Sequence, residues 1–189
     1  MSKGNLAIDH ILKIFCLAAK KTLEKGTRKE VRYSSTVQKI PKISLRPELG
    51  CFVQFSGDYN GLLVMNFSAV AALELYRNYM LTMGLPEAEL TDNATSSEVV
   101  DTMGELTNQI MGRAMQMVEA KYDLNAKFGQ PKAVYLNSAI ILSLENTSGG
   151  LTMSPEAQYS DNRRIVFTID NSRFHMEIAM ERTEFVTLE

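Results

Sequence analysis

The stretch DTMGELTNQIMG, residues 101–112, forms the centre of a segment that predicts a long helix from about Thr95 to Lys121. The segment contains no proline and two glycines, and its apolar residues recur every three or four positions. Thr95 and Glu98 have the spacing of a capping box, which favours a helix start at this point.

The two sides of this helix differ in chemistry. At about 100° per residue, Asp101, Glu105, Asn108 and Gly112 fall on one narrow stripe. The opposite side carries the apolar residues Val99, Met103, Leu106, Ile110, Ala114 and Met117. We therefore expect the helix to bury its apolar side and to expose an acid and an amide. Periodicity alone favours a solvated helix face, because polar residues on the exposed side of a helix are usually only solvated, so a function for the stripe needs further support.

Length and composition indicate an ordinary globular protein. The 189 residues fit a single domain over 1–189, in which residues 26–49 form either an added edge segment or an added lobe. Hydrophobic residues make up 45% of the chain and charged residues 22%, and the formal net charge of −2 argues against a nucleic-acid binder. Two isolated cysteines, no signal-peptide pattern and no run of 18 apolar residues favour a cytoplasmic protein without membrane insertion.

The rest of the pattern predicts helices and antiparallel hairpins. In chain order these are a helix over 6–25 that Gly26 ends, a hairpin of strands 51–56 and 62–67, a helix from Ser68 to about Gly84 that buries Val70, a polar connector over 122–130, a strand over 134–144, a turn over 146–150 and a hairpin over 165–180. This order predicts an α+β fold, an antiparallel sheet built from hairpins with helices packed on one face.

Familiar catalytic constellations are missing from the sequence. His10 and His175 are isolated, which favours structural or solvated histidines over metal ligands, and no P-loop or dinucleotide signature is present. Ser97 lies one turn before Asp101, but no histidine base accompanies it, so the pattern does not favour covalent catalysis. We expect no metal site and no cofactor of the protein's own.

The stripe and the residue Pro131, which follows Asn108 after 22 intervening residues, resemble the active-site signature of the CheC/CheX family of chemotaxis phosphatases. The glycines Gly57 and Gly61, in the hairpin upstream, are similar to the family's Gly-x-x-x-Gly strand pair, and Gly112 also fits its pattern. The resemblance covers roughly residues 50–180. The chain carries one such motif, which is similar to CheX, whereas CheC proteins typically carry two.

This resemblance implies a phosphatase that acts on the aspartyl phosphate of a phosphorylated CheY-like response regulator. In that reading Asn108 positions the attacking water, Glu105 pairs with the receiver's active-site lysine, and Asp101 and Gly112 support docking. Pro131 more simply shapes the connector. The receiver would supply both the nucleophile-bound phosphoryl group and its Mg²⁺. The resemblance also implies a homodimer that associates through its sheets.

Two alternatives stay open at the sequence level. The same helix could serve a non-catalytic module that binds a receiver or a flagellar-switch component. The protein could also be a structural or ligand-sensing homodimer whose stripe is only surface. The sequence does not name the cognate receiver.

Overall fold

A computed structural model describes residues 3–142 and 160–182. Its helices are α1 (Lys3–Thr27), α2 (Ala69–Thr82) and α3 (Ser97–Tyr122), with a short 3₁₀ helix η1 (Glu87–Glu89) between the last two. Its strands are β1 (Val31–Tyr33), β2 (Gln38–Lys39), β3 (Ile43–Leu45), β4 (Leu49–Gly57), β5 (Gly61–Phe67), β6 (Ala126–Phe128), β7 (Lys132–Tyr135), β8 (Ile140–Leu142), β9 (Ser160–Ile169) and β10 (Ser172–Glu181). No helix in these two ranges is long and apolar enough to cross a bilayer.

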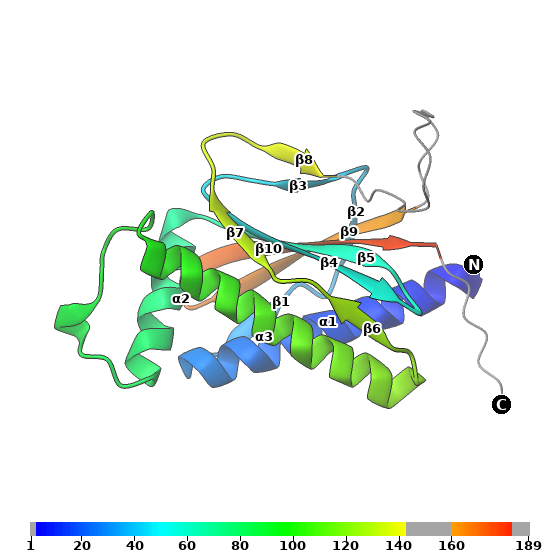
Figure 1. Cartoon of the computed structure of the whole chain (residues 1–189), viewed down its shortest axis with the longest axis horizontal. Helices are drawn as coiled ribbons and strands as arrows, with labels where there is room; N and C mark the ends of the chain where they lie inside the picture. The colour runs from blue at the N-terminus through cyan, green and yellow to red at the C-terminus, as the bar shows by residue number, and fades with distance from the viewer. Residues whose placement is uncertain (1–2, 143–159, 183–189) are drawn as a thin grey trace.

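The main sheet is antiparallel throughout. Its order is β1-β9-β10-β5-β4-β6, with β2 added beside β9 and β7 added beside β4, while β3 and β8 form a separate two-stranded sheet. The two predicted hairpins are present as β4–β5 and β9–β10, and residues 26–49 supply the strands β1 to β3. The α+β prediction is confirmed (Figure 1).

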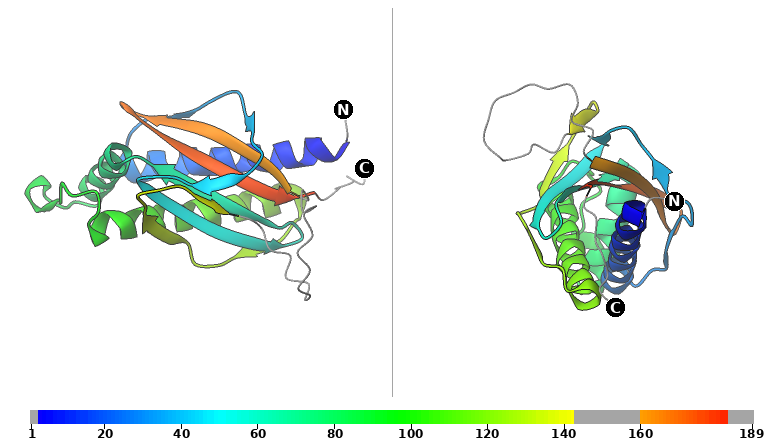
Figure 2. Two further views of the ribbon diagram at one scale, coloured as in Figure 1. Left: turned by 90° about the horizontal axis from the view of Figure 1, so that it is seen from above. Right: turned by 90° about the vertical axis from the view of Figure 1, so that its right-hand side faces the viewer.

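The core lies between the main sheet and the helices, which all cover the same face of the sheet (Figure 2). Alternation on β10 sends Phe174, Met176 and Ile178 into this core, in one cluster with the apolar residues of the helices. The close packing of this core holds the apolar side of α3 in place. The direction in which the exposed side of α3 faces is therefore fixed as well.

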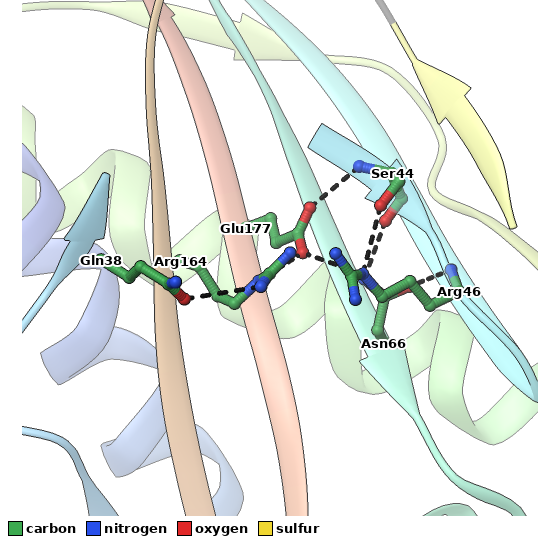
Figure 3. A network of polar contacts seen from close by, with 6 residues as sticks. All are labelled: Gln38, Ser44, Arg46, Asn66, Arg164 and Glu177. Carbon is green, nitrogen blue, oxygen red and sulfur yellow. Dashed lines mark hydrogen bonds and ion pairs between the residues drawn. The ribbon is translucent and has the colours of Figure 1, made fainter. Parts of the chain in front are cut away.

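The small β3–β8 sheet covers part of the opposite face. A second apolar cluster joins it to the main sheet, made of Ile40, Ile43, Leu45, Leu62, Val64 and Ala179. Beside this cluster the fully buried carboxylate of Glu177 accepts hydrogen bonds from Ser44 N at 2.9 Å and from Arg164 Nε at 2.8 Å (Figure 3). Arg46 Nε lies 3.5 Å from the same carboxylate. The polar network therefore ties the β3 segment to β9 and β10.

Asn66 completes this attachment from β5. Its Oδ1 accepts a hydrogen bond from Arg46 N at 2.7 Å, and its Nδ2 donates to Ser44 O at 2.9 Å (Figure 3). Backbone groups of the β3 segment that the two-stranded sheet leaves unpaired are thus satisfied by side chains of the main sheet.

The predicted strand over 134–144 is interrupted: residues 134–135 belong to β7, residues 140–142 form β8, and residues 143–144 lie outside the described residues. The chain pairs with β4 through β7, leaves the main sheet over residues 136–139, and pairs with β3 through β8. The predicted polar connector likewise contains β6, which pairs with the end of β4. Both differences arise because strands at an edge show mixed polarity, so periodicity does not mark them.

Two local predictions also need correction, and a third is not tested. Gly26 does not end α1 but lies within it, where a Cβ would come within 3.0 Å of the ring of Tyr79, and the helix continues to Thr27. Val70 is 70% exposed and not buried. The predicted turn over 146–150 lies outside the described residues.

Candidate functional site

The N-cap of helix α3 lies one residue later than the capping box predicts. Ser96, not Thr95, is the N-cap, and its Oγ accepts a hydrogen bond from Val99 N. Thr95 instead hydrogen-bonds to the side chain of Asn93. From this start, five of the six residues predicted for the apolar side are buried and the sixth, Met117, is partly buried against the core.

The opposite side of α3 presents the predicted stripe. Asp101, Glu105 and Asn108 are exposed, and Gly112 is half-buried one turn farther along. No lysine or arginine among residues 3–142 and 160–182 forms an ion pair with either carboxylate. A carboxylate and a carboxamide therefore project side by side from one face of a helix that the core holds rigidly.

Glu105 is held in place by a neighbour that the sequence interpretation missed. Gln109 Nε2 donates a hydrogen bond to Glu105 Oε1 at 2.9 Å and another to Tyr79 Oη at 3.2 Å. Because Tyr79 belongs to α2, the chain of contacts anchors the Glu105 carboxylate to a second helix. The spacing of four residues between Glu105 and Gln109 was the available signal, since such pairs face each other on a helix.

The segment that contains Pro131 returns to the motif helix. A Cβ built on Gly104 would lie 3.6 Å from Ala133 Cβ, so β7 runs directly beside the exposed side of α3. Pro131 is half-buried just before this strand. The long gap between Asn108 and Pro131 thus spans the rest of α3 and the strand β6, and brings the chain back to the side of α3 that bears the stripe.

Gly112 has open space in front of it. A Cβ at this position would meet no atom within 4 Å, so the fold itself does not require glycine there. A helix interior favours alanine over glycine, which leaves close approach by another molecule as a physical reason for a glycine at this point.

A hollow of about 510 Å³ adjoins the stripe between α2, η1 and α3. It is lined by Tyr76, Tyr79, Met80, Leu85, Glu89, Glu98, Asp101, Thr102 and Glu105. Within it Tyr76 Oη donates to Glu98 Oε2 at 2.8 Å, and burial together with this carboxylate raises the pKa of Tyr76 above its usual value. Tyr76 therefore stays a neutral donor.

The two cysteines are not activated as nucleophiles. Burial raises the pKa of Cys16 and of Cys51 to about 12, so both remain thiols at neutral pH. Within residues 3–142 and 160–182, no group of three or more potential metal ligands occurs. Chemistry at the stripe would consist of positioning and of electrostatic contacts with another molecule.

Comparisons with known proteins agree with this fold. A family model described as "Protein of unknown function (DUF3334)" matches residues 3–189. None of the curated proteins matches the chain. The structure of chemotaxis protein CheX from Desulfovibrio desulfuricans superposes with a TM-score of 0.65 at 17% identity, covering 91% of this chain and 99% of that one.

Two further solved structures have a similar fold. A CheX–CheY–BeF₃–Mg²⁺ complex from Borrelia burgdorferi matches with a TM-score of 0.63 at 17% identity, over 90% of this chain and 97% of that one. FliY from Thermotoga maritima matches with a TM-score of 0.60 at 18% identity, over 94% of this chain and 90% of that one. The predicted resemblance to CheC/CheX proteins is confirmed at the level of the fold.

Proposed function

The chain belongs to the DUF3334 family and has the fold of CheX, and from this premise we propose that it accelerates hydrolysis of the aspartyl phosphate of a CheY-type response regulator. One observation carries the proposal. Glu105 and Asn108 project together from the exposed side of a rigid helix, at the spacing that resembles the CheX motif. The similar CheX found in complex with CheY supports a receiver as the partner.

The proposed reaction needs little covalent chemistry from this protein. A phosphorylated receiver holds the phosphoryl group and the Mg²⁺ that neutralises it, so the remaining task is to place a water molecule in line with phosphorus. The Asn108 amide suits this task because its oxygen accepts a hydrogen bond from the water. The neutral amide also does not repel the phosphoryl oxygens.

Glu105 would dock the helix and not act as a base. The charge of its carboxylate pairs well with the lysine of a receiver active site. Gln109 and Tyr79 hold the carboxylate in position before the receiver arrives, which lowers the entropy lost on binding. Asp101 and Gly112 would complete the docking face.

The test follows phosphate loss from each phosphorylated CheY-type receiver of the same cell, with Mg²⁺ present. We expect Asn108→Ala to lower turnover on the order of 100-fold while largely sparing receiver binding, because water positioning is lost and docking is kept. Glu105→Ala should weaken both. Gln116→Ala, at an exposed position two turns farther along α3, is the matched control. Full activity in Asn108→Ala would refute its assigned role.

A second candidate is a binding module that engages a receiver or a flagellar-switch component without catalysis. The similarity of the fold to FliY supports this second candidate. The same experiment separates the two, since this candidate predicts receiver binding at Glu105 without faster phosphate loss. Either activity would be exercised in the cytoplasm, where phosphorylated receivers occur.

We further propose that the protein acts as a homodimer. Four large apolar side chains are exposed on β7 and β8: Val134, Tyr135, Ile140 and Ile141. These strands lie at the edges of the two sheets, so a second copy could cover their exposed side chains.

A further inference from the structure

The hollow beside the stripe combines an apolar floor with an acidic rim. Tyr79, Met80 and Leu85 contribute aromatic and aliphatic surface, and Leu85 is 39% exposed. Four carboxylates surround this surface, and two of them, Glu89 and Glu98, lie outside the motif. The hollow therefore continues the docking face from α3 onto η1 and α2.

The four carboxylates lack cationic partners in the part of the chain that the structure describes. Glu98 accepts its hydrogen bond from a tyrosine hydroxyl and Glu105 accepts its own from an amide, and both donors are neutral. None of the four forms an ion pair with a described lysine or arginine. Like charges gathered around one hollow favour an arriving cation and disfavour an arriving acid.

The shape and chemistry of the hollow select the kind of side chain that fits. A purely apolar side chain would remove water from the carboxylates without replacing their hydrogen bonds. A lysine or arginine side chain suits both the apolar floor and the acidic rim, because its methylene groups cover apolar surface while its charged end stays at the rim. The ring of Tyr79 adds an aromatic surface that attracts cations.

We propose that this hollow binds one long basic side chain of the receiver partner, from outside the receiver's own active site. The proposal rests on the proposed function, and it assigns to Glu89 and Leu85 a part in choosing among receivers. Receivers with a lysine or arginine beside the phosphorylation site would be preferred over receivers with an acidic or small residue there.

The experiment measures the affinity of the cell's CheY-type receivers, each loaded with beryllium fluoride and Mg²⁺, for the full-length protein at low salt. We expect Glu89→Lys to weaken binding of the cognate receiver about ten-fold, because it places a like charge at the rim. Glu87→Lys is the matched control, since it makes the same charge change on η1 at an exposed residue that does not line the hollow. Leu85→Ala should weaken binding about three-fold through lost apolar contact.

The outcomes distinguish failure of the hollow as a binding site from failure of the phosphatase proposal. Equal affinities of Glu89→Lys, Glu87→Lys and the unmodified protein would overturn the hollow as a binding site and leave the phosphatase proposal intact. A fall in affinity confined to Glu89→Lys, which shrinks as salt is raised, would support it. If the unmodified protein binds no loaded receiver, both proposals fail.

Discussion

Glu105 differs from Asp101 on the same stripe because a hydrogen-bonded neighbour fixes its side chain. Gln109 joins its carboxylate to the hydroxyl of Tyr79 on α2. A long side chain that is already held loses less freedom when it meets a partner, so the affinity of docking depends on Gln109 even though Gln109 itself need not touch the receiver.

Gln109→Ala tests this positioning at the scale of one residue. We expect the KM for the phosphorylated receiver to rise about three-fold with kcat nearly unchanged, because the Glu105 carboxylate must then be ordered during binding. Gln109 is half-buried, and the substitution keeps a good helix former, so stability should change by less than about 0.5 kcal/mol. An equal fall in kcat and kcat/KM would instead place Gln109 in the transition state.

The motif residues could be predicted from the sequence because their spacing is local. Asp101, Glu105 and Asn108 lie within two turns of one helix, and the apolar residues on the other side fix which way they point. The contact between Gln109 and Tyr79 was missed because it joins residues of two helices, 30 positions apart in the sequence. The acidic hollow was missed for the same reason, since Glu89 belongs to η1 and Asp101 to α3.

At the scale of elements, the long helices and tight hairpins were predictable and the edge strands were not. The β9–β10 hairpin alternates clearly because one of its faces is in the core. In contrast β7 and β8 each span four residues or fewer and are largely exposed, and their assignment to different sheets depends on pairing with β4 and β3. Pairing of this kind is long-range information that periodicity does not contain.

Substitution of Gly112 separates the effect of α3 on receiver binding from its effect on the stability of the fold. Gly112→Ala should stabilise the fold by about 0.5 to 1 kcal/mol, since the added methyl group meets no atom and alanine is the better helix former. The same methyl group should weaken receiver binding if the partner's backbone approaches here. Urea unfolding and receiver affinity are measured on the same preparation. Unchanged affinity in a stabilised variant would remove Gly112 from the docking face.

At the scale of the whole molecule, the two faces of the main sheet are covered by different elements. Helices cover one face and present the stripe, while β3 and β8 cover part of the other face. The buried Glu177 carboxylate and its arginines hold the β3 segment down, so the middle of that second face is not a free apolar surface. A dimer that forms through the sheets, as the family resemblance implies, would therefore use the exposed residues of β7 and β8.

Ile141→Asp tests this dimer, because Ile141 is 64% exposed on β8 and a buried carboxylate at an interface has no partner. We expect the unmodified protein to sediment with about twice the mass of one chain and the variant with the mass of one chain. Met83→Asp is the matched control, since Met83 is also 64% exposed and is the C-cap residue of α2. Both variants should still unfold cooperatively on heating, which excludes misfolding as the cause. A variant that still sediments as a dimer would show that the copies meet elsewhere. If the variant is a monomer, a phosphatase assay of the monomer and of the unmodified dimer would show whether activity at the stripe requires the dimer.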